Sequence, residues 1–522
     1  MNKPSRKFLA VNAEGAWNWL LGISLALGCF LIYWRTLCPT VFWYDSAEYA
    51  TAAVTLGIPH PPGYPLYTLI GRLFVLLPFE PARAINLMSA FFSTVTIALA
   101  FAVLRQLGVS GTAAAIGAAT LGLGRLFWSQ SIIAEVYTPG LAFLFVVLLL
   151  LFKGLAREKL WMMILAAALA GLGLGVHLYL ATCGLGFAVL VLGWGLPVQR
   201  LKDLRLLFSR QNLGRRLWVA AACLGAALLG SLIFLYVPLR AAMGPEMNFE
   251  NPSTWERFLW FVTGGNYKTW FLHDYSWSGR AWQILAIFYD QLLVVGLVLA
   301  ACGLIFLLWR RALVALALFF MMAGNVYFFF NYRVHDVEVF FLPTVANLCL
   351  LVGIGVHAIL TGLDSLLSAE RGPWIRRFVR IVLCGFPLSL LLANYRALDL
   401  SQYTAARDYG DKLSAQLPAN AVILNFTRPA EWKNDAVFTH YFQKVLHKRR
   451  DVRVLSRTTP LQVLGLLHQG GQVFLYYPVP EVLALFEVKK EGEVYRVLRP
   501  RHLSERSPTQ ELNKAKQPAS KM

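Results

Sequence analysis

The run WNWLLGISLALGCFLIYWRTL, residues 17–37, is long and apolar enough to cross a bilayer as one helix. The hydrocarbon core of a membrane requires about 20 such residues. Lys3, Arg6 and Lys7 precede the run, and basic flanks of this kind are retained on the cytoplasmic side. The run continues past a weak lipoprotein-like box to Trp34, which predicts an uncleaved signal anchor with a cytoplasmic N-terminus.

Apolar runs of similar length recur along the chain. Of the 522 residues, 57% are hydrophobic and 15% are charged, whereas a soluble chain carries about a quarter charged residues. Further spans are predicted at 84–105, 111–128, 138–154, 160–177, 179–197, 217–238, 283–308, 312–330, 339–360 and 375–394. The shorter stretch 66–78 contains Arg72 and predicts an interfacial or re-entrant helix. The fold class is therefore an all-α polytopic membrane protein with about eleven transmembrane helices.

The net charge of +20 follows this topology. Predicted cytoplasmic connections near 153–159, 200–216, 310–311 and 371–380 carry clusters of Lys and Arg, and the predicted outer connections are poor in them. These clusters indicate orientation and contact with anionic membrane lipid. Aromatic residues at the regular spacing of nucleic-acid readers are absent from the sequence, so no nucleic-acid partner is expected.

The chain changes character after the last predicted span, which delivers it to the extracytoplasmic face. Short helices and strands then alternate, which predicts a small α/β domain. The helices are expected at 400–416, 435–447 and 460–469, and the strands at 421–426, 452–455, 472–477 and 494–498. The expected organisation is a membrane domain (1–394), a soluble domain (395–502) and a disordered tail (503–522). None of the seven cysteines lies in the soluble domain, which excludes a disulfide framework there.

Polar residues suited to chemistry gather in the predicted outer loops. Asp45 and Glu48 are three residues apart, so a helix would place both carboxylates on one face, although a solvated loop or a helix cap is the plainer reading. His60 lies within IPHPPGYP (58–65), whose prolines and glycine predict a rigid turn. Such a turn is either a wall of a site or a connector.

The second predicted outer loop contains an acid between apolar residues, Glu135, near the membrane surface. A carboxyl group is costly there unless it is used or paired. Tyr137 follows it and is compatible with an aromatic belt as well as with a substrate contact. His177, at the outer end of a span, is compatible with a packed interfacial histidine or a substrate contact.

Two later outer loops add cations and polar groups. Arg240 ends a span, where it would extend to lipid headgroups or bind a phosphate, and Arg333 is a second phosphate candidate because a guanidinium matches phosphate oxygens in a fork. Asp336 either pairs with Arg333 or contacts substrate. Asn248 and Lys268 lie in the long loop after the seventh span.

Several segments together resemble a known family of membrane proteins. They are DSAEY (45–49), HPPGYPLY (60–67), INLMSA (85–90), FWSQSIIAEVYTP (127–139), PLRA (238–241), NPSTWERFLWFVTGG (251–265) and DVEVFFLP (336–343). The family is the protein O-mannosyltransferase-like membrane family, which is similar to the GT-C glycosyltransferases. The resemblance implies a helical membrane glycosyltransferase whose first outer loop carries a catalytic acid, here Asp45. Ala47 occupies a place where the family pattern leads us to expect glycine.

The resemblance also implies a polyprenyl-phosphate-linked sugar donor, with mannose the first candidate, and a hydroxyl acceptor on an exported protein or a glycan. Such a transfer needs a base for the hydroxyl and cations for the leaving phosphate. Asp45 is the expected base, with Glu48 or Glu135 orienting it or the acceptor. The expected phosphate ligands are Arg240, Arg333, His60 and Lys268. The expected substrate contacts are Tyr137, His177, Asn248 and Asp336.

No cofactor is required by this chemistry. A divalent metal is compatible with it, but no ligand set in the sequence demands one. Two other classes remain open, a lipid or glycan transporter or flippase and a non-catalytic envelope assembly protein. A transporter is disfavoured because its polar residues are expected near the bilayer midplane on broken helices.

Overall fold

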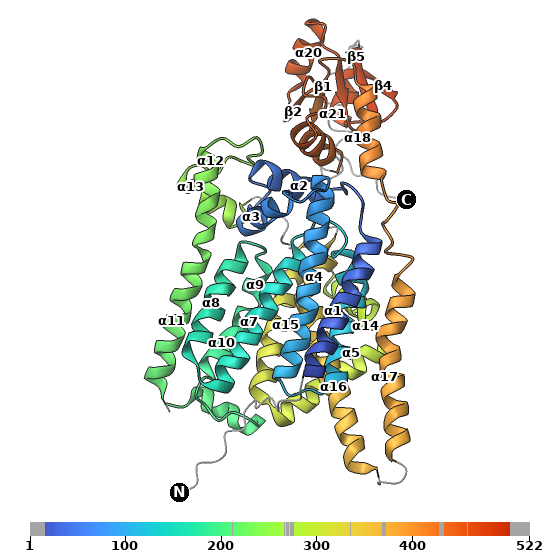
Figure 1. Cartoon of the computed structure of the whole chain (residues 1–522). Coiled ribbons are helices and arrows are strands. Elements are labelled where there is room, and N and C mark those ends of the chain that lie inside the picture. The colour runs from blue at the N-terminus through green and yellow to red at the C-terminus, as the bar shows by residue number, and fades with distance from the viewer. Residues whose placement is uncertain are drawn as a thin grey trace.

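The structure is a computed structural model that describes residues 16–501 except 211, 266, 268–270, 272–275, 335, 368–371, 427–432 and 457. Long helices run side by side as a bundle, and a small domain that contains all the described strands stands at one end of it (Figure 1). The predicted disordered tail at 503–522 lies outside the described residues.

Among the described residues, seven helical segments are long and apolar enough to cross a membrane. They are α1 (Ala16–Thr36), α4 (Pro81–Gln106), α7 (Tyr137–Arg157), α11 (Leu213–Ser231) continued by η2 (Leu232–Leu235) and α12 (Tyr236–Ala242), α14 (Trp277–Arg310), α15 (Ala312–Phe330), and η4 (Val337–Phe341) continued by α16 (Leu342–Leu366). With these helices, the chain is a multi-pass membrane protein, as predicted.

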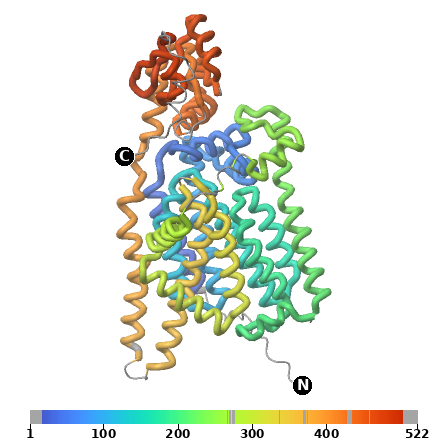
Figure 2. Tube along the Cα trace, turned by 180° about the vertical axis from the view of Figure 1, so that it is seen from behind, coloured from blue at the N-terminus to red at the C-terminus, as the bar shows by residue number. Residues whose placement is uncertain are grey.

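The other four predicted spans also lie on helices, which are shorter or more polar. They are α5 (Gly111–Leu123) followed by α6 (Arg125–Ser129), α8 (Leu160–Leu174), α9 (Tyr179–Thr182) followed by α10 (Gly184–Leu192), and α17 (Gly372–Asn394). Seen from behind, α17 climbs the outside of the bundle and leads into the small domain (Figure 2). The start of α1 and the small domain therefore lie at opposite ends of the bundle (Figure 1).

Helix α16 lies at the centre of the bundle. In its most apolar stretch 89% of the residues are buried by the rest of the protein, whereas in that of α11 only 17% are buried. Its closest neighbour is α14, because both helices carry glycine where they cross. A Cβ added at Gly303 would lie 2.0 Å from the carbonyl oxygen of Leu351, and one at Gly355 would lie 1.9 Å from that of Leu299. Because lipid is as apolar as the helices, such close backbone packing is a main source of association between them.

Short helices cover the end of the bundle nearest the small domain. Among them are α2 (Asp45–Thr55) and α3 (Pro65–Phe74), with α13 (Trp255–Val262) beside α12 (Figure 1). The helix predicted at 66–78 is therefore present. It buries Tyr67 and Gly71, whereas the apolar side chains of Leu73 and Leu76 are exposed. A short 3₁₀ helix, η1 (Leu201–Phe208), precedes α11.

The small domain is built on a five-stranded sheet of order β2-β1-β3-β5-β4. The strands are β1 (Val422–Asn425), β2 (Arg453–Ser456), β3 (Val473–Leu475), β4 (Phe486–Glu491) and β5 (Val494–Pro500), and the helices are α18 (Ala405–Gln416), η5 (Ala436–Val445), α20 (Pro460–His468) and α21 (Pro480–Leu485). Strand β1 pairs in parallel with β2 and with β3, and β5 pairs in antiparallel fashion with β3 and with β4. The predicted α/β class is confirmed, with β4 and α21 as elements that the sequence did not indicate.

The small domain is attached to the bundle through Glu80, which lies just before α4. One carboxylate oxygen, Oε1, accepts hydrogen bonds from Arg407 Nη1 (2.8 Å), Tyr441 Oη (2.7 Å) and Thr40 Oγ1 (3.0 Å). Trp43 Nε1 also donates to Tyr403 Oη at 2.9 Å. These contacts hold η5 directly against α2.

Candidate active site

The first predicted acid pair lies at the start of α2. Tyr44 precedes this helix with φ 54° and ψ −129°, a conformation that is strained for a bulky residue. Asp45 and Glu48 both lie in the first turn, as predicted. Ala47 is buried inside the helix with an ordinary φ, so a glycine is not needed there. The unusual backbone is supplied by Tyr44 instead.

Glu48 and His60 form a tightly hydrogen-bonded pair. His60 Nδ1 lies 2.6 Å from Glu48 Oε2, and the His60 backbone N–H donates to Glu48 Oε1 at 2.7 Å. The Glu48 side chain is fully buried. Burial alone would lower the pKa of His60, but the carboxylates of Glu48 and Asp45 outweigh it and raise that pKa to about 9. The imidazole is thus a fixed cation at neutral pH.

The other nitrogen of the same imidazole faces the remaining polar groups. His60 Nε2 lies 3.1 Å from Tyr64 Oη and 3.9 Å from Asp45 Oδ2. Tyr64 has a left-handed backbone, φ 40°, where the rigid turn enters α3. Tyr49 packs edge-on against Tyr64 and also contacts the imidazole ring. Neither tyrosine was among the predicted site residues, although both belong to the quoted motifs.

Glu135 belongs to the same cluster. Its backbone N–H donates to Ser89 Oγ at 3.2 Å, and Thr138 Oγ1 donates to the Ser89 carbonyl at 3.0 Å, which fixes the loop before α7 on α4. Burial raises the pKa of the Glu135 carboxyl well above its usual range, and the neighbouring charges of Asp45 and Asp336 raise it further. Three carboxyl groups from distant segments therefore act on one another.

Asp336 and Arg333 come from the loop that joins α15 to η4. Asp336 immediately precedes η4, and its charge also contributes to the raised pKa of His60. Arg333 is exposed in the same loop. Lys268, predicted as a phosphate ligand, lies outside the described residues, so its position is not assigned.

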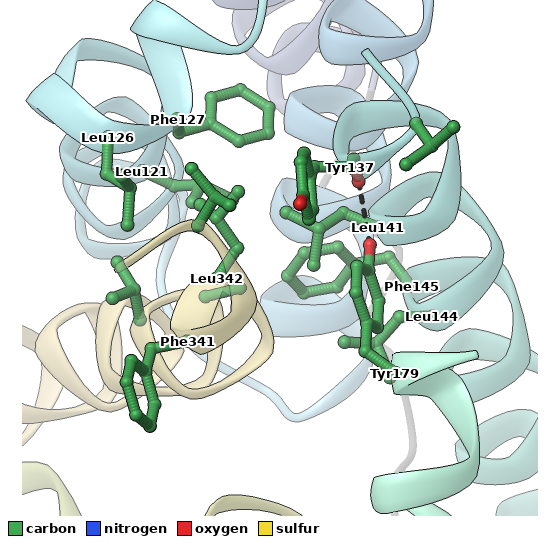
Figure 3. Close-up of a cluster of buried hydrophobic side chains, with 14 of the residues drawn as sticks. Leu121, Leu126, Phe127, Tyr137, Leu141, Leu144, Phe145, Tyr179, Phe341 and Leu342 are labelled. Atoms are coloured by element: carbon green, nitrogen blue, oxygen red, sulfur yellow. Dashed lines mark hydrogen bonds between the residues drawn. The ribbon is translucent and has the colours of Figure 1, made fainter. Parts of the chain in front are cut away.

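Tyr137 and His177 are buried beside this cluster, as parts of an aromatic wall. The His177 ring lies 5.0 Å from Tyr137, 4.5 Å from Tyr179 and 6.1 Å from Tyr64, measured between ring centroids. Tyr179 Oη donates to the Tyr137 carbonyl at 2.7 Å (Figure 3). Tyr137 also belongs to a cluster of buried hydrophobic side chains that includes Leu141 and Phe341 (Figure 3).

Arg240 and Asn248 are positioned differently from the acids. Arg240 Nε donates to the Leu56 carbonyl at 2.7 Å and Nη2 donates to the Thr55 carbonyl at 3.1 Å, so its guanidinium caps the C-terminus of α2. Asn248 Nδ2 donates to the Ala241 carbonyl at 3.3 Å, and the Asn248 segment forms a parallel bridge with Ile58. Both residues thus support the turn and the helix that carry His60 and Asp45.

Asp45, Glu48 and His60 also have the composition of a metal site, with one possible ligand atom from each within 4.8 Å of the others. However, both oxygens of Glu48 already accept hydrogen bonds from His60. A metal bound to His60 Nε2, the nitrogen that faces Asp45, would leave the bond between Nδ1 and Glu48 in place. The set is therefore compatible with a hydrogen-bonded pair and with a metal held by His60 and Asp45.

Comparison with known sequences supports the resemblance seen in the motifs. Residues 45–195 match the family model of the protein O-mannosyl-transferase TMEM260 N-terminal domain. Mouse protein O-mannosyl-transferase TMEM260 is 35% identical over 133 residues, which are 24% of this chain and 19% of the mouse protein. The Dictyostelium discoideum protein of the same name is 40% identical over 52 residues, 10% of this chain and 6% of that protein. The match thus spans about a fifth of the mouse relative at most.

Comparison with solved structures extends the likeness to the whole fold. ArnT from Cupriavidus metallidurans, in its crystal structure bound to undecaprenyl phosphate, aligns with a TM-score of 0.59 at 13% identity, covering 92% of this chain and 98% of ArnT. The apo crystal structure of ArnT gives 0.56 at 12% identity, with 92% and 97% covered. The predicted GT-C-like fold is confirmed.

Proposed function

We propose that this chain is a membrane glycosyltransferase that moves a sugar from a polyprenyl-phosphate donor to a hydroxyl acceptor at the extracytoplasmic face. The observation that carries the proposal is the convergence of Asp45, His60, Glu135 and Asp336 beneath the small domain, at one end of the helix bundle. Their segments are far apart in the sequence, and bringing carboxyl groups together is costly unless they serve a purpose.

The proposed reaction is a single displacement with inversion, as the resemblance implies. Asp45, which is about one-third exposed, accepts the proton of the acceptor hydroxyl. The hydroxyl oxygen forms a bond to the anomeric carbon while the bond from that carbon to the phosphate oxygen breaks. Polyprenyl phosphate leaves with the electron pair, and the fixed cation of His60 stabilises its charge.

Glu135 suits a different role. Burial and the neighbouring carboxylates raise its pKa, which favours the protonated carboxyl, the form that can donate a hydrogen bond to the acceptor or the sugar. Arg333 remains a candidate phosphate ligand because it is exposed in the loop that carries Asp336. Arg240 contributes through the position of α2 rather than through a free guanidinium.

The donor class is supported by two observations. ArnT, which shares the fold, is seen bound to undecaprenyl phosphate. The acids also lie at the end of a membrane bundle, where a lipid-linked sugar is within reach and a soluble donor has no special access. Mannose is the first candidate sugar because the matched relatives are named O-mannosyl-transferases, and a Ser or Thr of an exported protein is the first candidate acceptor.

A donor panel tests the proposal. Purified protein in lipid nanodiscs is incubated with polyprenyl-phosphate mannose, polyprenyl-phosphate glucose or a nucleotide-linked mannose, together with Ser/Thr peptides and glycans. We expect transfer from a polyprenyl-phosphate sugar and none from the nucleotide sugar, with an inverted anomeric configuration in the product. Movement of a lipid across the nanodisc without any transfer would instead support a flippase.

The extracytoplasmic position of the small domain is tested separately by labelling in intact cells. A cysteine at the exposed position Lys412, on α18, is expected to react with a membrane-impermeant maleimide. A cysteine at the exposed position Lys202, on η1, is expected to react only after the cells are opened. The reverse pattern would place the acids on the cytoplasmic side.

A further inference from the structure

The small domain packs against the helix that carries the acid pair. Its helix η5 has the π-helical hydrogen-bond pattern, which is rare and is frequently found at functional sites. One side of η5 is buried through Phe438, Tyr441 and Phe442, and the helix packs against α2, the element that carries Asp45 and Glu48.

The partly buried side chain of Lys444, on η5, points into this junction. Its ammonium donates to His440 Nδ1, 3.3 Å away. Burial lowers the pKa of Lys444, while the charges of Asp435, Glu48 and Glu246 oppose that effect. Lys444 thus lies within electrostatic reach of Glu48 and so belongs to the surroundings of the acid cluster.

A shallow cavity of about 260 Å³, wide open to the surface, lies at the same junction and is lined by Glu246, Gln443, Lys444 and Arg450. We call it the seam cavity, because Glu246 lies in the loop that follows α12 of the membrane domain and the other three residues belong to the small domain. The Gln443 amide is fixed, since its Nε2 donates to the carbonyls of Arg449 at 2.9 Å and Val452 at 2.8 Å.

The charges of the seam cavity favour an anionic occupant. Arg450 Nη2 lies 3.1 Å from Glu246 Oε1, but both side chains are about half exposed, at 54% and 52%. Exposed ion pairs contribute little stability, so a ligand can exchange for one partner at small cost. With two cations against one carboxylate, the lining carries a net positive charge.

We propose that the seam cavity is the acceptor subsite, which binds an acidic side chain of a polypeptide next to its acceptor hydroxyl. Lys444 and Arg450 bind the carboxylate, and the adjoining hydroxyl is thereby directed toward Asp45 on α2. This inference rests on the proposed function and assigns the small domain the role of selecting the acceptor. Lys444 is a substrate-binding residue in this arrangement and takes no part in proton transfer.

The test compares two Ser/Thr peptides that differ only in an Asp or an Asn beside the acceptor residue, with the polyprenyl-phosphate sugar that proves active in the donor panel. We expect the wild-type enzyme to prefer the Asp peptide by about fivefold in kcat/KM, as one charge-assisted contact would give. Lys444→Gln should remove this preference without changing the KM of the donor. Lys444→Glu should invert it toward a peptide that carries Lys.

Two further variants make the result specific. Arg450→Gln changes a half-exposed side chain, so it should fold normally and reduce the preference by about half. Lys448→Gln, the matched control, removes a nearby exposed cation that pairs with Asp411, and the preference should persist. Equal transfer to both peptides by the wild type, or a raised donor KM in Lys444→Gln, would overturn the acceptor subsite and leave the transferase intact. Absence of transfer to any acceptor would overturn both.

Discussion

His60 Nδ1 lies 2.6 Å from Oε2 of Glu48, while the backbone N–H of the same histidine donates to the other oxygen of that carboxylate. A fully buried acid therefore binds one residue twice and turns its other ring nitrogen, Nε2, toward Tyr64 and Asp45. We therefore propose that Glu48 positions His60, and the reacting groups are expected to be Asp45 and the cation beside it.

Glu48→Gln should impair catalysis by misplacing His60. We expect kcat to fall about 10²-fold, a loss typical of a displaced acid–base group, with little change in the KM of the acceptor. The pKa of His60 should also fall, because the carboxylate that raises it most is lost. Steady-state kinetics between pH 6 and 10 measure both effects. Glu256→Gln, an exposed acid on α13, is the control and should behave as the wild type.

The stability of the protein should depend on pH through His60. Its pKa of about 9 in the folded chain lies above the ordinary value of 6.5, so protonation stabilises the folded state. This contribution is fully present below pH 6.5 and is lost as the pH rises through 9. In thermal unfolding scans the Tm of the wild type should fall across that window, and that of His60→Gln should fall less. Identical pH profiles would show that His60 is not a buried cation.

Glu135 should tolerate an amide. Burial and the charges of Asp45 and Asp336 raise the pKa of its carboxyl, so the proposed role of Glu135 is that of a hydrogen-bond donor, and glutamine can also donate. Glu135→Gln should keep kcat/KM within about threefold, whereas Glu135→Ala should lose about 10-fold or more, as expected when a buried hydrogen bond is removed. If both variants lose activity equally, Glu135 works as a carboxylate.

Glu80 should hold the small domain in place. Glu80→Ala leaves Arg407 and Tyr441 without their shared acceptor, and it should destabilise the attachment by about 1–3 kcal/mol. Limited proteolysis should then release the small domain faster. Asp364→Ala, which removes a more exposed ion pair to Arg376 at the opposite end of the bundle, should leave the rate unchanged. An unchanged rate in both variants would assign the attachment to the apolar contacts of η5 with α2.

The helices could be predicted because lipid imposes a simple rule on sequence. A span must be apolar for about 20 residues, so runs such as 17–37 and 84–105 are visible directly. The strands of the small domain were found for a similar reason, since β1 begins in the fully buried apolar run AVIL at 421–424. By contrast, β4 (FEVKKE) lies at the edge of the sheet, is only partly buried and is as polar as a loop.

The site was predicted in composition but not in contacts. Local spacing placed Asp45 and Glu48 on one helical turn, whereas the pairing of Glu48 with His60 depends on the fold of the proline turn between α2 and α3. Glu80 and Lys444 were not identified as important. The partners of Glu80 on the small domain lie 327 and 361 residues away in the sequence, a separation that no local pattern records.

The most direct test of a catalytic acid at the start of α2 is sugar transfer by Asp45→Asn, compared with the wild type, from the active polyprenyl-phosphate sugar. The variant keeps the size of the side chain and should fold and bind the donor normally. We expect its kcat to fall by about 10³-fold, within the range for loss of a general base. Transfer that survives the substitution in a folded variant would contradict the assignment and would move the base to another residue, with Glu135 the first to examine.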